Sequence, residues 1–453
     1  MMSYSTLKAM IHSFKDLGCS QVLSKTLAVN QDNEKNQIYF GYSLELLSLF
    51  PAQVSFRTPS ESRLKRGSSA GKSIVEHALE FYWLDEGREP ARAPNAKIID
   101  YFQYPEMRFS GFLSGCVNPP DSLRRDSQDG YGRRILIIGI AAEKVYGTVI
   151  TDKACSFVDE LNNSVSSVTH GVFKQLSVLN STENQINPDL LIEELKSVGS
   201  KSQYESRILR KEGDATEPFR GTQGAGWTLE ALLGIPRNSS GLPDKYGFEL
   251  KAFLSTTITL MTPEPNFGYR YEKGLTAFLD KYGWPGTKND GSRRFNGRHS
   301  TLGAYKKSGL TLTIEHWDSV SNSPTGKGSP NVLLVDQTNG EIAAGWSFEK
   351  LAEKWGKKHA GAMFVSARKF LKEPGPLASH YSFGPQVHCG RGTSVLLLLK
   401  AISSGSVYLD PGDRVNAQGQ EKKRTQWRVS KGRGVSFAST LAPLYDAMET
   451  FEI

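Results

Sequence analysis

The chain has 453 residues, of which 38% are hydrophobic, 10% aromatic and 23% charged. This composition excludes a disordered or collagen-like chain, and the length excludes a single small module, because domains usually hold about 100 to 200 residues. Residues 1–160 contain 19 basic and 19 acidic residues, so the net charge of +8 lies in the rest of the chain, where it fits either a polyanionic partner such as nucleic acid or an ordinary solvated surface.

The first region, residues 1–165, reads mostly as short strands. Residues 37–44, 134–142 and 145–152 are rich in Ile, Val and Tyr and are separated by clusters of Gly, Asn and Pro, which is typical of strands and turns. The segment IVEHALEFYWL, residues 74–84, predicts one helix. We therefore expect a mostly β barrel or sandwich domain here.

A domain boundary is expected where the composition changes. Residues 161–187 are rich in Ser and Asn and contain few large apolar clusters, which indicates a linker over 166–187. The following segment begins with Pro188 and Asp189, residue types favoured in the first turn of a helix. The second domain is therefore expected to span 188–453.

Helices and strands alternate through this second region. Helices are predicted at 227–234 and 347–358, and strands at 248–254, 256–262, 311–317, 331–336 and 362–370. Asn339 and Gly340 predict a tight hairpin turn between two strands. The mixture indicates an α/β or α+β fold. The sequence has no internal repeat of about 20 to 50 residues, which excludes a solenoid or a propeller.

One short segment carries groups suited to chemistry on a phosphodiester. Pro243 and Asp244 precede Glu249 and Lys251, which stand two residues apart on an expected strand and therefore point to the same face. Glu230, on the helix before, supplies a further carboxylate. Oxygen ligands of this kind suit a hard cation, Mg²⁺ first, which activates water and neutralises phosphate charge, while Lys251 can hold the attacking water.

Taken alone, this pattern also fits a solvated surface turn followed by an edge strand, but its surroundings favour the first interpretation. Three strings of residues follow one another: Gly224, Gly226, Thr228, Leu229, Glu230, Leu232, Leu233, Gly234 and Ile235, then Pro243, Asp244, Gly247, Glu249, Leu250 and Lys251, then Thr259, Leu260, Thr262 and Pro265. This order closely resembles the catalytic core of the MvaI/BcnI restriction endonucleases and of the related mismatch-repair nicking enzyme MutH.

The resemblance implies a PD-(D/E)xK restriction-endonuclease fold for the second domain. Carried over by position, Asp244 and Glu249 are the metal ligands, Lys251 is the catalytic lysine, and Glu230 is the helix carboxylate near the metal. The glycines of the first string are expected to let the backbone approach DNA. His380 and His388 are expected to be structural, because the motif already has its carboxylates and its lysine.

A second stretch, residues 405–430, resembles the late segment of the same family, where a strand and loop present arginines to DNA. Residues 410–433 hold seven basic and three acidic residues, with Trp427 among them. Arginine reads guanine in the major groove, whereas lysine mostly contacts phosphate. We expect base contacts from Arg414, Arg424 and Arg428 and phosphate contacts from Lys422 and Lys423, the alternative being a solvated basic hairpin.

The N-terminal region departs from the family pattern, since MvaI- and BcnI-type enzymes consist essentially of the catalytic part. Residues 25–51 resemble the opening of the B3-like DNA-binding domain of EcoRII. The resemblance implies a pseudobarrel that grips DNA, with these candidate contacts: Arg57, Arg63, Lys65, Arg66, Lys97 and Arg108. The alternative is a structural or dimerising β domain, and the zero net charge of the region argues against strong nonspecific binding.

These features together predict a Mg²⁺-dependent type II restriction endonuclease. The resemblance implies a monomer that cuts double-stranded DNA at a short G·C-rich pseudopalindrome such as CCWGG or CCSGG, with a cognate DNA methyltransferase as a functional companion. The alternatives are a MutH-like strand-specific nicking endonuclease and a noncatalytic DNA-binding protein with a nuclease-like core.

The sequence also predicts the compartment. No apolar run approaches the roughly 20 residues that span a bilayer, and the first residues lack a signal-peptide core. We therefore expect a cytoplasmic protein without a membrane partner. The four cysteines are too few and too scattered for a disulfide framework or a zinc site.

Overall fold

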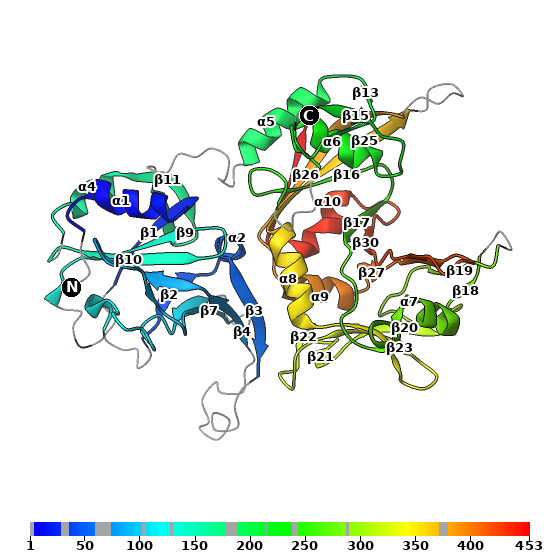
Figure 1. Ribbon diagram of the computed structural model, residues 1–453, viewed down its shortest axis with the longest axis horizontal. Helices are drawn as coiled ribbons and strands as arrows, with labels where there is room; N and C mark the ends of the chain where they lie inside the picture. Colours follow the sequence, from blue (N-terminus) through cyan, green and yellow to red (C-terminus); the bar gives the residue numbers. More distant parts are fainter. Residues whose placement is uncertain are drawn as a thin grey trace. The chain divides into compact units, whose positions relative to one another are not determined.

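The structure is a computed structural model (Figure 1). It describes residues 4–28, 36–58, 74–101, 106–124, 126, 130–153, 155–176, 188–213, 215–237, 243–286, 290–370 and 379–453. The chain divides into two compact units, Met1–Gln185 and Ile186–Ile453, and each is described by itself. No helix within the described ranges is long and apolar enough to cross a membrane.

Two sheets make up most of the N-terminal unit, as far as its residues are described. The first is seven-stranded, in the order β11 (Val165–His170), β12 (Phe173–Leu176), β1 (Gln21–Leu27), β9 (Arg134–Ile140), β10 (Val145–Thr151), β5 (Phe81–Trp83) and β6 (Ala91–Arg92). The second is five-stranded, in the order β2 (Ile38–Gly41), β8 (Met107–Ser110), β7 (Lys97–Asp100), β4 (Ile74–Leu79) and β3 (Ala52–Arg57). The helical elements are α1 (Leu7–Asp16), α2 (Leu44–Leu49), α4 (Val158–Asn163) and the 3₁₀ turn η1 (Asp121–Leu123).

Helix α1 covers the seven-stranded sheet with one apolar face. Its buried residues Leu7, Met10, Ile11 and Phe14 follow the spacing of a single helix face. They belong to the same buried cluster as Ile137 of β9. The mostly β content agrees with the sequence, while the B3-like pseudobarrel stays a prediction.

Residues 74–84 form strands β4 and β5, so the predicted helix is wrong. Along this segment alternate side chains are buried, among them Val75, Leu79 and Trp83, while Glu76 and Glu80 are less buried. Alternation of this kind is the period of a strand. Glu80 separates β4, in the five-stranded sheet, from β5, in the seven-stranded sheet.

The expected linker begins with strands. β12 pairs with β1, where Leu23 lies opposite Gln175, and Phe173 and Leu176 are buried. Buried apolar side chains of this kind are typical of a strand in a folded domain and not of a linker. The N-terminal unit therefore continues beyond residue 165 to at least Leu176.

A mixed sheet forms the centre of the C-terminal unit. Its order is β13 (Tyr204–Glu205), β26 (His380–Arg391), β25 (Gly361–Phe370) and β16 (Glu249–Phe253), and β31 (Ala447–Glu452) also pairs with β26. β16 runs parallel to β25, with Glu249 opposite Ala362, whereas β25 and β26 are antiparallel. In the sheet as described, β25 is the neighbour of β16.

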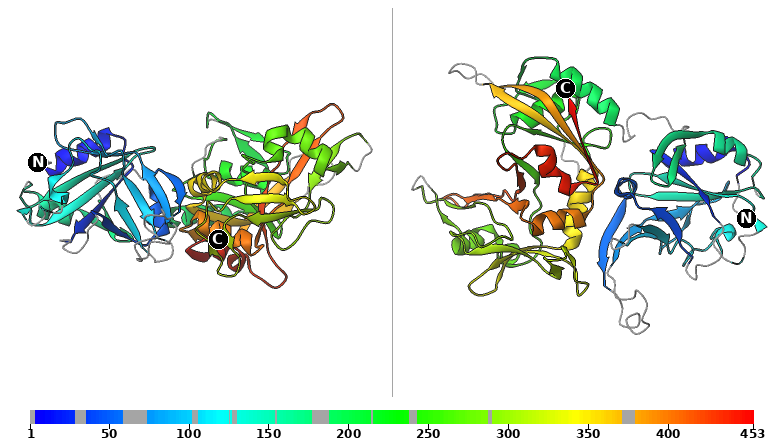
Figure 2. Two further views of the ribbon diagram at one scale, coloured as in Figure 1. Left: turned by 90° about the horizontal axis from the view of Figure 1, so that it is seen from below. Right: turned by 180° about the vertical axis from the view of Figure 1, so that it is seen from behind.

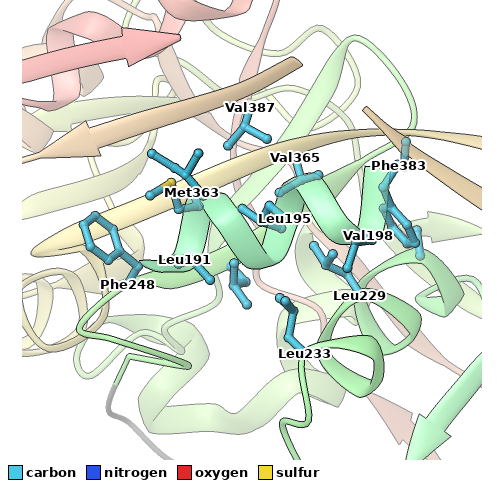
Figure 3. Close-up of a cluster of buried hydrophobic side chains, with 14 of the residues drawn as sticks. Leu191, Leu195, Val198, Leu229, Leu233, Phe248, Met363, Val365, Phe383 and Val387 are labelled. Carbon is cyan, nitrogen blue, oxygen red and sulfur yellow. The ribbon is translucent and has the colours of Figure 1, made fainter. Parts of the chain in front are cut away.

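Helices α5 (Pro188–Gly199) and α6 (Gly224–Leu232) pack on this sheet. Figure 3 shows Leu191, Leu195 and Val198 of α5 gathered with Leu229 of α6 and with Met363 and Val365 of β25. These side chains are all buried. The helix predicted from residue 188 is confirmed, and its apolar face packs against β25, the neighbour of β16.

Apart from one hairpin that precedes α6, the remaining elements of this unit lie between β16 and β25 or after β26. In the described ranges they form these sheets: β17 (Thr257–Met261), β30 (Trp427–Ser430) and β27 (Val407–Leu409); β18 (Trp284–Pro285), β19 (Arg293–Asn296), β28 (Gly412–Val415) and β29 (Glu421–Lys422); β20 (Leu310–Ile314), β23 (Val332–Asp336) and β24 (Ile342–Trp346); β21 (Trp317–Asp318) and β22 (Ser323–Pro324); and β14 (Arg207–Leu209) with β15 (Thr216–Pro218). The other helices are α7 (Tyr269–Tyr282, interrupted at Gly274), α8 (Phe348–His359), α9 (Val395–Ser403), α10 (Phe437–Leu441) and the 3₁₀ turn η3 (Ala442–Leu444). α8 and α9 lie side by side (Figures 1 and 2). The mixed α/β prediction is confirmed for this unit.

Candidate active site

Helix α6 carries Glu230 and is held closely against the sheet by its first turn. A Cβ added to Gly224 would lie 2.5 Å from the hydroxyl of Tyr381, so a larger residue does not fit. Thr228 Oγ1 donates a hydrogen bond of 2.6 Å to the carbonyl of Gly224. Gly224 therefore serves the packing of the helix, while a Cβ at Gly226 would meet no atom within 4 Å, and the approach of this backbone to DNA stays a prediction.

The turn between α6 and β16 places Asp244. Gly247 takes a φ of +76°, in the left-handed region that favours glycine. Lys245 anchors the turn through an ion pair of 2.6 Å with Glu194 on α5. Asp244 Oδ2 then accepts a hydrogen bond of 2.8 Å from the backbone N–H of Leu250, which fixes its carboxylate beside the start of β16.

Strand β16 presents Glu249 and Lys251 on one face, as the two-residue spacing predicts. Lys251 Nζ lies 2.9 Å from Glu249 Oε1. Glu249 is 5% exposed, and its other oxygen, Oε2, is buried without a hydrogen-bond partner. Lys358 Nζ stands 3.6 Å from that oxygen, too far for a hydrogen bond. The structure thus brings Asp244, Glu249 and Lys251 together at one end of the strand.

The charges of the carboxylates act on one another. Burial, together with the negative charges of Asp244 and Glu249, raises the pKa of Glu230 to about 8. Burial, followed by the charge of Glu249, raises the pKa of Asp244 to about 6. Burial opposes ionisation of Glu249 too, but the lysine charges, Lys251 first, bring its pKa below the ordinary value. Three carboxyl groups therefore lie together in one partly buried region. The nearby lysines do not supply enough positive charge to keep all three ionised.

This cluster fits a divalent cation. Within the described residues no three His, Cys, Asp or Glu side chains converge into a complete metal cage, but Mg²⁺ is usually held by one or two carboxylates together with waters and substrate phosphates. Glu249 Oε2 has no hydrogen-bond partner, and the neighbouring groups are oxygen donors. Asp244 and Glu249 are the residues that would hold the ion.

Sequence reasoning missed Lys358 and His359, the last two residues of α8. Because β25 runs parallel to β16, the residues just before β25 lie beside the start of β16. His359 is buried, stacks on Trp355 with ring centroids 4.1 Å apart, and its Nε2 lies 3.0 Å from the carbonyl oxygen of Leu260. Burial lowers the pKa of His359 to about 3, so the neutral ring donates to that carbonyl. The sequence signal was a basic helix end ahead of a strand. This signal points to the site only when the pairing of β25 with β16 is known.

The predicted DNA contacts of the C-terminal unit fall into two groups. Arg414 and Lys422 lie opposite each other on β28 and β29, and Lys423 and Arg424 follow as exposed residues. Arg428 is different, because its guanidinium donates to Asp410 Oδ2 (2.5 Å), Gln426 Oε1 (2.8 Å) and Thr259 Oγ1 (3.1 Å). The guanidinium of Arg428 is therefore engaged in hydrogen bonds within the protein.

Trp427, His388 and His380 also lie in this part of the chain. Trp427 is fully buried against Trp346, so it belongs to the core and not to a DNA-facing surface. His388 is buried, and its Nδ1 lies 3.0 Å from Thr450 Oγ1. His380 lies on β26 opposite Glu205 of β13.

In the N-terminal unit, the candidates Arg57, Lys97 and Arg108 share one face of the five-stranded sheet, according to its register. Each also has a carboxylate partner. Glu76 pairs with both Arg57 (2.8 Å) and Lys97 (3.0 Å), and Glu106 pairs with Arg108 (3.1 Å). The remaining candidates lie outside the described residues: Arg63, Lys65 and Arg66.

The chain is similar to known proteins. The sequence model of the MvaI/BcnI restriction endonuclease family matches residues 192–434, which contain Glu230, Asp244, Glu249 and Lys251. The solved structure of restriction endonuclease MvaI with its cognate DNA substrate is similar at 18% identity and a TM-score of 0.43, covering 58% of this chain and 97% of that one. MvaI in the absence of DNA is similar at 16% identity and a TM-score of 0.30, covering 58% and 96%. No curated protein matches the chain. Since the family model spans more than half of the residues, the chain belongs to the MvaI/BcnI restriction endonuclease family and is a site-specific DNA nuclease.

Proposed function

We propose that the protein is a Mg²⁺-dependent type II restriction endonuclease that cuts both strands of duplex DNA at a short G·C-rich pseudopalindrome of the CCWGG or CCSGG kind. One observation carries the proposal. Asp244 and Glu249 stand together at the start of β16, with Lys251 Nζ 2.9 Å from one oxygen of Glu249 and with the other oxygen free of hydrogen bonds among the described residues. Buried charges in such an arrangement serve chemistry more readily than stability.

Each residue has a role in this reaction. A bound divalent ion, held by Asp244 and Glu249, would neutralise phosphate charge and lower the pKa of a water. Lys251 holds and orients the attacking water and stabilises the negative charge that grows on the phosphate oxygens. Glu230 adds a third carboxyl to the same place. The products are a 5′ phosphate and a 3′ hydroxyl.

The same proposal covers the rest of the chain. The C-terminal unit, from about residue 188, carries catalysis and sequence recognition. The N-terminal unit, with a B3-like fold, is a second DNA-binding domain. The position of Arg57, Lys97 and Arg108 on one face of its sheet supports this role. The enzyme acts as a monomer, and a DNA methyltransferase protects the same sequence in the cell.

The catalytic assignment is tested by substitution in the full chain. Asp244→Asn, Glu249→Gln and Lys251→Met should each lower the rate of plasmid cleavage in Mg²⁺ by at least about 100-fold. Duplex binding, measured in Ca²⁺, should persist, because the metal cluster and the base contacts use different residues. Matched controls are Glu353→Gln and Lys354→Met, an exposed pair on α8. Cleavage at the wild-type rate by any of the three variants contradicts the assignment.

The same digest separates the alternatives. A restriction enzyme gives double-strand breaks whose sequenced ends share one motif. A nicking endonuclease of the MutH kind gives open circles instead of linear DNA. Sequencing ends from DNA of known methylation also identifies the recognition sequence and the effect of cytosine methylation.

A further inference from the structure

The four-stranded sheet β18-β19-β28-β29 has one covered face. Phe295 of β19 and Asp413 of β28 are buried on that face, where Asp413 pairs with Arg270 of α7 at 2.8 Å. Glu421 of β29 accepts a hydrogen bond of 3.0 Å from the hydroxyl of Thr276, also on α7. The residues between these positions must point to the opposite face, because side chains alternate along a strand.

The strand register places a row of residues on that opposite face. Trp284 lies opposite Arg294, Arg294 opposite Arg414, and Arg414 opposite Lys422. Directly opposite residues of paired strands share a face. Three cations therefore stand side by side across β19, β28 and β29, in what we term the basic row: Arg294, Arg414 and Lys422.

Two donor atoms of the basic row make no hydrogen bond within the described part of the chain. The Nε atoms of Arg294 and Arg414 are buried and have no hydrogen-bond partner among the described residues. Arg414 does pair with Asp290, through Nη2 at 3.1 Å. At the other end, the ammonium of Lys307 lies 5.3 Å from the centre of the Trp284 ring, which adds a further positive charge. This contrasts with Arg428, whose guanidinium is engaged within the protein.

We propose that the basic row lies in the major groove of duplex DNA and that Arg294 is a base-reading residue. The proposal rests on the proposed function. Strands lie about 4.8 Å apart, so three side chains across them cover about 10 Å, close to the roughly 12 Å width of the major groove, which admits a β-ribbon. Arg294 and Arg414 carry the planar donors that match guanine, and Lys422 reaches phosphate.

Arg293 provides a matched control. It precedes Arg294 in the same strand, has the same charge, points to the covered face and pairs with Asp280 of α7. Arg294→Gln and Arg293→Gln therefore remove the same charge from opposite faces. Arg294→Lys is the third variant, since it keeps the charge but loses the paired donors of a guanidinium.

The experiment uses the full chain in Ca²⁺ and two labelled duplexes of equal length, one from a plasmid fragment that the wild-type protein cuts and one that it leaves intact. Arg294→Gln should weaken binding to the cut fragment by about 5- to 150-fold and lose much of the preference over the intact fragment. Arg294→Lys should lose the preference while keeping the salt dependence of the wild type. Arg293→Gln should bind both fragments as the wild type does.

Each other outcome is decisive. Wild-type binding by Arg294→Gln overturns the role of the basic row and leaves the nuclease assignment intact. Equal losses in Arg294→Gln and Arg293→Gln at unchanged melting temperature also overturn it, because the two side chains face opposite ways. An equal loss on both fragments removes the base-reading role. A wild-type protein that cuts no plasmid DNA in Mg²⁺ supplies no cut fragment and overturns the proposed function together with this inference.

Discussion

Lys358 stands beside the oxygen of Glu249 that a cation needs. Its ammonium lies 3.6 Å from Oε2, and its side chain is 38% exposed, so the pair is partly screened by solvent. Lys358→Met should therefore raise the affinity of the DNA-free protein for a divalent ion, by about fivefold if the pair contributes about 1 kcal/mol. Titration calorimetry with Mn²⁺ or Ca²⁺ measures the change.

A lysine elsewhere on the same helix provides the comparison. Lys354→Met removes an exposed ammonium of α8 that pairs with Glu353 at 3.6 Å, and it should leave the ion affinity unchanged. A fall in ion affinity for Lys358→Met would mean that Lys358 supports the carboxylates and does not compete with the cation.

Asp100 in the N-terminal unit predicts a pH dependence of stability. It is 2% exposed, its Oδ1 has no partner, and burial raises its pKa to about 7. A carboxyl whose folded pKa lies above its unfolded value of 3.8 imposes no penalty below about pH 4, and stability falls as the pH rises from about 4 to about 7. Asp100→Asn should therefore stabilise residues 1–185 at pH 8, by on the order of 4 kcal/mol, and scarcely at pH 4.

Urea midpoints of residues 1–185 at both pH values check this prediction. Asp121→Asn serves as the control, because Asp121 is an exposed carboxylate of the same unit whose partner, Arg124, lies 3.1 Å away on the surface. A gain from Asp100→Asn that is the same at pH 4 and pH 8 would show that the pKa of this carboxyl does not differ between the folded and the unfolded protein.

Among the secondary-structure elements, the sequence predicted correctly those that depend on neighbouring residues, such as tight turns. The hairpin at Asn339 and Gly340 is confirmed, since β23 and β24 pair around it and Gly340 has a φ of +74°. Residues 74–84 were misread because Leu, Ala and Glu favour a helix, while the alternate burial that makes them strands comes from two different sheets. In this segment tertiary packing outweighed the helix propensity of the residues.

The candidate site divides in the same way. Asp244, Glu249 and Lys251 lie within one turn and one strand, so their spacing alone brings them together. Lys358 reaches Glu249 only through the parallel pairing of β16 with β25. The basic row depends on the pairing of β19 with β28, which joins segments more than a hundred residues apart. Long-range register of this kind is not written in any short stretch of sequence.

For the chain as a whole, the two units should separate in function. Residues 186–453 contain every catalytic candidate and form one compact unit. A fragment beginning at Ile186 should fold, bind Mg²⁺ and cut the same sequence as the full chain. Its DNA affinity should be lower and less sensitive to salt, because fewer phosphates are neutralised. Binding at several salt concentrations, compared with the full chain, measures the difference.

The complementary fragment should extend to Gln185 and not stop at residue 165. Stopping there would remove β12, which pairs with β1 and buries Phe173 and Leu176. Residues 1–185 should bind duplex DNA at low salt without cutting it. Absence of binding, together with full affinity of the Ile186–Ile453 fragment, would make the N-terminal unit structural or a binder of another partner.

The parallel pairing of β16 with β25 also sets the order in which the active site can be completed during synthesis. Glu249 meets Ala362 across the sheet, and about a hundred residues of inserted chain, including Arg294 and the whole of α7, lie between them. Closing so long a connection is slow, so it follows the compaction of what it encloses. A ribosome that stops within the insertion releases a chain with Asp244, Glu249 and Lys251 but without the neighbouring strand or Lys358. Truncated products of this gene should therefore be harmless to the cell's own DNA.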